Sequence, residues 1–241
     1  MNPPDSPSSS VLESLRHQIT QFEGGRQPPD QQPVSTACAP LDRLLPRGGL
    51  ARGTLVEWLA VGEGAGAESL AFQTAREACR NTGALLVVDR HREFYPPAAI
   101  RLGLAASQIV VVYPAGNADF IWTLDQALRC PAAAATLAWV DRLDGRSFRR
   151  FQLAAEQGAT LGLLVRPAEA RVEPSWADVR LLIEPLPSLE AAGRRLKIHL
   201  LRCRGGADGQ TIEVVLDDET RGLHLAAQVG QPTRSRCAAG A

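Results

Sequence analysis

The chain of 241 residues is long enough for one α/β domain with a short appendage, and its apolar fraction of 45% excludes disorder throughout. The 26 basic residues balance the 26 acidic ones, so any affinity for nucleic acid or membrane must be local. The five cysteines are odd in number and, like the histidines, lack metal-ligand spacing, and no signal peptide or membrane-length apolar run is seen. We therefore expect a soluble intracellular protein without a disulfide framework or a metal site.

The first 33 residues are predicted to form a segment tethered to the core. Residues 1–10 and 24–33 are rich in Pro, Ser, Gln and Gly, a composition that does not pack. Between them an apolar stripe recurs at helical spacing and predicts a short amphipathic helix, with Val11, Leu15, Ile19 and Phe22 on one face. This helix either folds back onto the core or docks on another molecule, and its four apolar residues are candidate partner-binding residues.

Residues 34–230 have the pattern of an α/β core. Six short apolar runs have the length and branching of strands buried on both faces, which is typical of a parallel sheet covered by helices. They span residues 54–60, 84–89, 108–114, 135–141, 160–166 and 179–184. Helices are expected between them, over about residues 69–81, 117–129 and 146–157. The fold class is therefore α/β, with a mostly parallel sheet flanked by helices.

The alternation of strands and helices ends after Glu184. Residues 194–216 predict a C-terminal β-hairpin whose two strands join around Gly205, Gly206 and Gly209. Residues 231–241 are expected to form a flexible tail.

The hairpin begins with basic residues that are candidates for DNA binding: Arg194, Arg195, Lys197, Arg202 and Arg204. No acidic residue interrupts residues 191–207, so this ribbon could follow a phosphate backbone. Strand alternation predicts that Arg195, Lys197 and His199 share one face while Arg202 and Arg204 lie on the other. The alternative is a solvated edge strand whose charges resist aggregation.

A second arginine cluster opens the helix that follows Asp141, and it comprises Arg142, Arg146, Arg149 and Arg150. Cations at a helix start oppose its dipole, which favours a partner carboxylate or phosphate. Pairing with Asp144 and Glu156 in the same chain is the alternative.

Residues 59–72, LAVGEGAGAESLAF, run from an apolar strand through a glycine-rich turn into a helix, as a P-loop does. Laid over the pattern G-x-x-x-x-G-K-[ST], Gly62 takes the first glycine and Ser69 the hydroxyl, with Gly66 adding freedom to the turn. Glu68 takes the place of the lysine. A carboxylate about 4 Å from a phosphate is repelled by on the order of 4 kcal/mol at an effective dielectric near 20. The sequence therefore predicts a degenerate phosphate site.

Four blocks follow one another in the order of a RecA-type core and resemble it: STACAPLDRLLPRGGLARGTLVEW with the loop, GALLVVDRHREFYPPAAIRLGL, QIVVVYPAGNADFIWTLDQALRC and ATLAWVD. Three further strings, ADFIWTLDQALRCP, RFQLAAEQGATLGLLVRP and RCRGG, resemble ImuA-type proteins, which are shortened RecA relatives that accompany translesion synthesis. The resemblance covers about residues 35–216 and implies a RecA-like fold.

The resemblance also implies that the catalytic parts are missing. The RecA pattern Asp-x-Glu carries a water-activating glutamate, but Asp89 is followed two positions later by His91, and Glu93 comes two further on. Asp141 occupies the Walker B position, where it could share a metal ion with Ser69. We expect this nucleotide site to be non-functional, with no catalytic residue and no cofactor.

The function implied by the resemblance is that of a non-catalytic accessory factor in DNA damage tolerance and SOS mutagenesis in the bacterial cytosol or nucleoid. Its expected partners are translesion polymerase-associated proteins, DNA through phosphate contacts, and further copies of itself. Two alternatives remain open. One is an ATP-dependent recombinase or ATPase with an unusual P-loop, using ATP and Mg²⁺. The other is a protein-interaction module without DNA contact, such as a cell-division inhibitor.

Overall fold

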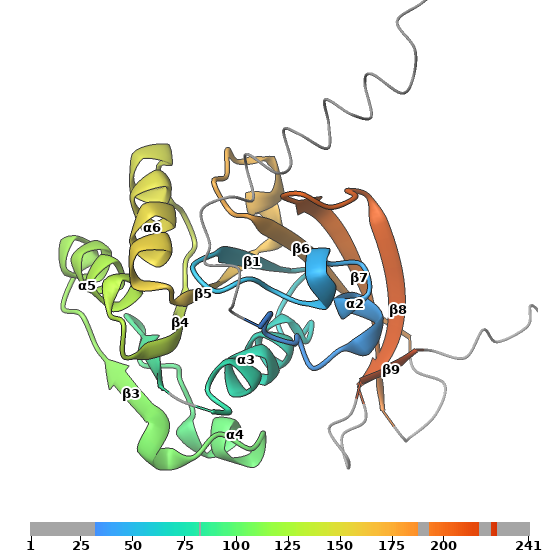
Figure 1. The fold of residues 1–241 in the computed structure, drawn as a ribbon, viewed down its shortest axis with the longest axis horizontal. Helices are drawn as coiled ribbons and strands as arrows, with labels where there is room; N and C mark the ends of the chain where they lie inside the picture. Colours follow the sequence, from blue (N-terminus) through green and yellow to red (C-terminus); the bar gives the residue numbers. More distant parts are fainter. Residues whose placement is uncertain (1–31, 82, 188–192, 217–222, 226–241) are drawn as a thin grey trace, which may run out of the picture.

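The computed structural model describes residues 32–81, 83–187, 193–216 and 223–225, and its strands form one sheet in the order β3-β2-β4-β5-β1-β6-β7-β8-β9 (Figure 1). The strands are β1 Leu55–Ala60, β2 Ala84–Val88, β3 Ile109–Val112, β4 Ala133–Trp139, β5 Leu161–Pro167, β6 Val179–Leu186, β7 Arg194–Cys203, β8 Gln210–Leu216 and β9 Leu223–Leu225. The strands from β3 to β6 in this order run parallel, and β7, β8 and β9 extend the sheet antiparallel.

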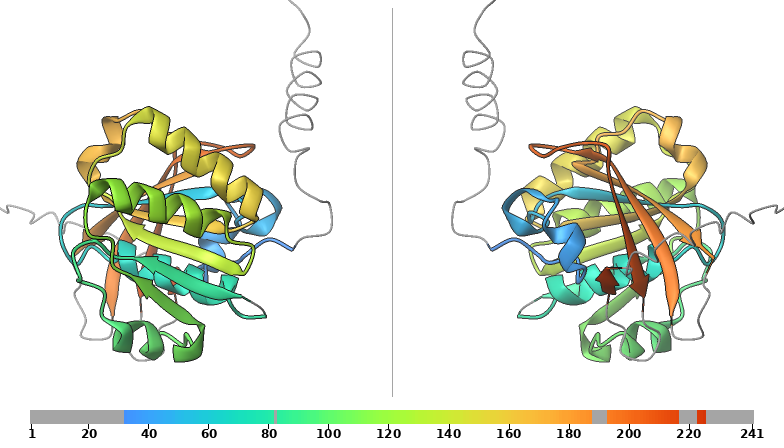
Figure 2. Two further views of the ribbon diagram at one scale, coloured as in Figure 1. Left: turned by 90° about the vertical axis from the view of Figure 1, so that its left-hand side faces the viewer. Right: turned by 90° about the vertical axis from the view of Figure 1, so that its right-hand side faces the viewer.

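The helices are α2 Ala39–Asp42, α3 Ala67–Ala78, α4 Pro96–Arg101, α5 Asn117–Arg129 and α6 Gly145–Gly158, with short 3₁₀ turns η1 Pro46–Gly48, η2 Ala106–Gln108 and η3 Ala168–Val172. Helices α5 and α6 cover one face of the sheet, and α3 covers the other (Figures 1 and 2). Each face has its own apolar core: Trp58 packs on the α3 side, whereas Phe148 and Phe151 pack on the α5–α6 side.

The strand and helix assignments made from the sequence are confirmed to within a few residues, and α5 lies where the helix over 117–129 was predicted. The prediction that every parallel strand is buried on both faces is wrong for β3. This strand lies at the edge of the sheet, and Val110 and Val112 keep 46% and 36% of their surface exposed. The pattern of a short apolar run does not distinguish an edge strand from a central one.

The C-terminal hairpin is confirmed as β7 and β8, and the three-residue strand β9, which was not predicted, adds to it. On β7, Leu196, Ile198 and Leu200 are buried in the core on the α3 side, so the hairpin is an integral part of the domain. The predicted N-terminal helix with Val11, Leu15, Ile19 and Phe22 lies outside the described residues, as does the tail 231–241.

Within the described ranges, no helix combines the length and apolar character needed to cross a membrane.

Candidate functional site

The loop between β1 and α3 keeps the backbone shape of a phosphate-binding turn. Three glycines adopt left-handed conformations, Gly62 at φ 83°, Gly64 at φ 68° and Gly66 at φ 91°. A Cβ at Gly66 would also lie 2.8 Å from Leu196 Cδ1 on β7, so the Leu196 side chain would have to shift. Parallel strands present their carboxyl ends at one edge of the sheet, so this loop meets the end of β4. We call the loop 61–66 with Glu68, Ser69, Trp139 and Asp141 the nucleotide corner.

Glu68 occupies the position of the missing lysine and is already bonded within the chain. Its Oε1 accepts a hydrogen bond of 2.7 Å from Trp139 Nε1, at the end of β4. The Trp139 ring packs against Phe72 and Phe94, with centroids 6.2 and 6.4 Å apart. Where a P-loop lysine would reach the phosphates, a carboxylate is therefore held by an indole that is itself fixed by two aromatic rings.

The Walker-B-like acid, Asp141, faces Arg90 and His91 of the β2–α4 connection. Its Oδ2 lies 3.6 Å from Arg90 Nη2 and 3.9 Å from His91 Nε2, and 70% of the side chain is exposed. Arg90 also donates to Asn117 Oδ1 on α5 at 3.1 Å.

Asp89 has a structural role that explains its place after β2. Its buried carboxylate accepts hydrogen bonds from the backbone N–H groups of His91, Arg92 and Phe94, at 2.8 to 3.1 Å. Asp89 thus shapes the turn, and His91 is exposed beside Asp141. Glu93 is also exposed.

A RecA-like fold implies ATP and Mg²⁺, but the side chains of the nucleotide corner do not fit them. The backbone could still cradle a phosphate. However, the corner presents the carboxylate of Glu68 where a cation is needed, and Asp141 is engaged by Arg90.

A buried ionic network on the α6 side of the sheet was missed by the sequence reasoning. Glu57, fully buried in β1, lies 2.6 Å from Arg166 Nη1 of β5 and 2.5 Å from Arg180 Nε of β6. It also accepts a 2.7 Å hydrogen bond from Ser175 Oγ, and Arg166 reaches Glu173 at 2.6 Å. The signal was the presence of Glu57, Arg166 and Arg180 within three apolar runs, because a buried charge requires a partner.

The basic hairpin has a different face arrangement from the predicted one. A register shift lies between the pairs Leu181–Leu200 and Arg180–Arg202, so that Leu201 is an extra residue in β7. Such a bulge reverses the alternation of side chains. Arg202 therefore shares a face with Arg195, Lys197 and His199, and the prediction that it lies on the opposite face is wrong.

Acidic residues from neighbouring strands lie among these cations. Arg195 forms an ion pair of 3.0 Å with Glu213, and Lys197 lies in register between Glu184 on β6 and Glu213 on β8. His199 is 3.3 Å from Glu184. The acid-free sequence of residues 191–207 thus becomes a face of mixed charge in the sheet.

The last two arginines of the DNA-binding candidates contact the segment before β6. Arg202 Nη1 donates to the carbonyl of Ser175 at 3.0 Å, and Arg204 Nη1 lies 3.4 Å from Asp178 Oδ1. Burial raises the pKa of Asp178, and its hydrogen bond from the Leu55 N–H and the charge of Arg204 offset this only in part. Arg194 is exposed at the other end of β7.

The second arginine cluster finds its carboxylate on α5. Arg150 Nε lies 2.9 Å from Asp125, which also binds Arg129 at 3.0 Å. Burial by itself would raise the pKa of Asp125, but the hydrogen bonds from the two arginines outweigh it and lower that pKa. The predicted partner carboxylate is therefore Asp125.

The alternative pairing of this cluster with Asp144 is wrong, because Asp144 caps α6. Its carboxylate accepts from the N–H groups of Arg146 and Ser147 and from the Ser147 hydroxyl. These bonds lower the pKa of Asp144. Arg149 instead lies over the ring of Trp176, 4.8 Å from its centroid.

The chain is similar to known proteins over most of its length, although no family model matches it. It is 30% identical over 189 residues to Protein ImuA of two strains of Caulobacter vibrioides, covering 70% of this chain and 78% of the relative. It is 28% identical over 96 residues to the cell division inhibitor SulA of Photorhabdus laumondii subsp. laumondii, covering 40% of this chain and 54% of SulA.

Among solved structures, the RadB recombinase has a similar fold, with a TM-score of 0.61 and 18% identity over 80% of this chain and all of that one. At this identity the likeness concerns the fold alone, and it agrees with the RecA-like architecture expected from the sequence. The sequence match extends across the greater part of both chains. The chain therefore belongs to the ImuA family and has a RecA-like fold.

Proposed function

We propose that this protein is a non-catalytic accessory factor of DNA damage tolerance that uses a RecA-like fold as a scaffold rather than as an ATPase. Membership of the ImuA family supports the biological setting. The observation that carries the proposal is the hydrogen bond between Glu68 and Trp139 at the position where a P-loop lysine would meet the phosphates.

The energies at this position oppose nucleotide binding. Losing the lysine removes a charge-assisted hydrogen bond of about 1.5–3 kcal/mol. The Glu68 carboxylate adds a repulsion of about 1–4 kcal/mol at 4 Å, between the limits of bulk water and a protein surface. The dipole at the start of α3 returns at most about 2 kcal/mol. A nucleoside triphosphate would also have to displace Glu68 from Trp139.

The nucleotide test is calorimetry with Mg-ATP on the purified chain. We expect no measurable binding below millimolar concentration and no hydrolysis. Micromolar affinity that disappears in Ser69→Ala would contradict the proposal and favour the ATP-dependent alternative.

The biological test is complementation of a host that lacks the gene. Damage-induced mutation should be restored equally by the wild-type protein, by Ser69→Ala and by Asp141→Asn, because neither side chain is required for a scaffold. A well-folded Ser69→Ala protein that fails to complement would overturn the non-catalytic role. In the same strain, a fluorescent fusion of the protein tests whether it acts in the bacterial cytosol or at the nucleoid.

DNA contact through the hairpin remains part of the proposal, with Arg194, Arg195, Lys197, Arg202 and Arg204 as candidates. Glu184 and Glu213 lie on the same face, so we expect weak binding that salt suppresses. Translesion polymerase-associated proteins and further copies of the chain are the proposed protein partners, with the segment 1–33 as the candidate docking element. Deletion of residues 1–33 should reduce association while the core stays folded.

The similarity to SulA over 40% of the chain favours one other role, a protein-interaction module that inhibits division. Overproduction in a bacterial host separates the roles. Filamentation of the cells without any effect on damage-induced mutation would support the division inhibitor and exclude the accessory factor.

A further inference from the structure

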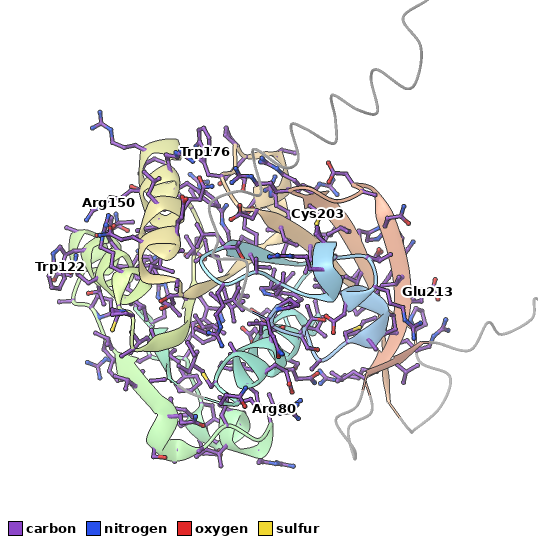
Figure 3. The ribbon with its side chains drawn as sticks, viewed as in Figure 1. Arg80, Trp122, Arg150, Trp176, Cys203 and Glu213 are labelled. Carbon is purple, nitrogen blue, oxygen red and sulfur yellow. The ribbon has the colours of Figure 1, made fainter. Side chains whose placement is uncertain are left out.

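An exposed tryptophan lies where two separate arginine clusters meet. Arg149 of α6 lies 4.8 Å above the Trp176 ring, and Arg202 of β7 donates to the carbonyl of the preceding residue, Ser175, at 3.0 Å. Figure 3 shows Trp176 beside α6, on the side away from Arg150, which turns toward α5. Residues more than 50 positions apart in the sequence thus form one surface. We call it the Trp176 surface; it comprises Arg146, Arg149, Leu153, Trp176 and Arg202.

The segment that carries Trp176 is held in place by its contacts with the buried ionic network. Glu173 is bonded to Arg166, and Ser175 donates its hydroxyl to Glu57 while its oxygen accepts from the Ala177 N–H. Asp178 then accepts the N–H of Leu55 at 3.0 Å. Trp176 is therefore held on a rigid support, which reduces the entropy lost when a partner covers it.

The apolar part of this surface lies on α6 and on the β5–β6 connection. Trp176 keeps 45% of its surface exposed, and Leu153, one helical turn after Arg149, keeps 42%. Val172, on the same β5–β6 connection as Trp176, is 83% exposed. Tryptophan and arginine together are the residues most enriched where protein interfaces gain their affinity.

The charged part of the surface is positive. Among the described residues, no carboxylate lies within ion-pair distance of Arg146, Arg149 or Arg202. The nearby acids already have partners within the chain. Asp144 caps α6, Glu173 pairs with Arg166, and Asp178, on which the charge of Arg202 also acts, pairs with Arg204. The surface therefore lacks anions that a partner could supply.

We propose that the Trp176 surface docks an acidic segment of a partner protein that also carries a large apolar side chain. The arginines would meet its carboxylates, and Trp176 with Leu153 would cover the apolar group. A nucleic acid fits less well, because phosphates gain nothing from Leu153 and Val172, and Arg149 already covers one face of the Trp176 ring. This inference goes beyond the proposed function, and it holds whether or not the nucleotide and mutagenesis tests succeed.

The test uses the full chain and a fluorescein-labelled peptide that alternates Asp with Leu and Phe, followed by fluorescence anisotropy. We expect binding that weakens with salt, and a loss of about tenfold or more in Trp176→Ala. Arg149→Ala and Arg202→Ala should each weaken binding by about threefold to tenfold. A peptide with Ser in place of Leu and Phe should bind much more weakly, because it keeps only the charges.

Trp122→Ala is the matched control, since Trp122 is 62% exposed on the outer side of α5, away from Trp176 (Figure 3). It should leave the affinity unchanged, and thermal melting should show both tryptophan variants folded. Absence of peptide binding, or equal losses in the two tryptophan variants, overturns the proposal. Tighter binding of oligo(dT) than of the peptide, lost in Trp176→Ala, would also overturn it and assign the surface to nucleic acid.

Discussion

At the nucleotide corner, Glu68 is bonded to Trp139 and Asp141 faces Arg90, whereas at the Trp176 surface Arg149 and Arg202 have no carboxylate within ion-pair distance in the described part of the chain. Both regions lie on the same sheet and both contain exposed charges. In the first region the two acids, Glu68 and Asp141, each have a partner within the chain. In the second region the guanidinium groups of Arg149 and Arg202 lack a carboxylate partner among the residues that the structure describes, and we propose that a binding partner supplies one. This difference is the basis of the two proposals, that the nucleotide corner does not bind ATP and that the Trp176 surface docks a partner.

The largest expected effect separates Glu57, in β1, from Glu68, in the first turn of α3. Glu57→Gln should lower the free energy of unfolding by about 3–5 kcal/mol, because it leaves Arg166 and Arg180 buried without their counter-charge. Glu68→Gln should change it by less than about 0.5 kcal/mol, as an exposed substitution. Urea unfolding of both variants checks this. Equal losses of stability in the two variants would contradict the assignment of Glu57 to a buried ionic network and of Glu68 to an exposed hydrogen bond.

Asp125→Asn should cost about 1.5–3 kcal/mol at neutral pH, because it removes charge-assisted hydrogen bonds to Arg129 and Arg150. The pKa of Asp125 is lowered in the folded state, so its contribution is complete above the usual aspartate pKa of 3.8 and is lost as the pH falls through the folded pKa. Unfolding measured against pH should show wild type and variant converging only in acid. If the stabilities of wild type and variant converged as the pH rose, the assignment of a lowered Asp125 pKa would be wrong.

A smaller effect tests whether the glycines of the loop between β1 and α3 are needed for packing against the hairpin. Gly64→Ala and Gly66→Ala both place a Cβ at positive φ, at a cost of about 1–2 kcal/mol each. Only Gly66→Ala also pushes a Cβ against Leu196 on β7, so it should be the more destabilising of the two. Thermal unfolding compares them. If the two variants are equally stable, the loop is not retained for its packing against the hairpin.

The smallest effect concerns DNA. If the hairpin contacts phosphates, Arg202→Ala with Arg204→Ala should flatten the plot of log K against log salt by about 1–2 units for every sequence. Arg204 already pairs with Asp178, so it contributes less to phosphate contacts, and we expect the change in slope to lie near the lower end of this range. Filter binding at several salt concentrations measures the slope. An unchanged slope would move the contact to Arg142 and Arg146 at the start of α6.

The sequence by itself determined the α/β class, the order of the elements and the presence of Glu68 and His91 at the positions of the P-loop lysine and the catalytic glutamate. Apolar periodicity and chain order are local properties, and so is the replacement of a lysine by Glu68 and of a glutamate by His91. The partners of the charges were decided by the tertiary structure. Glu57 meets Arg166 and Arg180 because β1 lies between β5 and β6, and a bulge at Leu201 sets the face of Arg202. Charge pairing depends on which strands are neighbours and on their register, and neither is written in the local pattern of one strand.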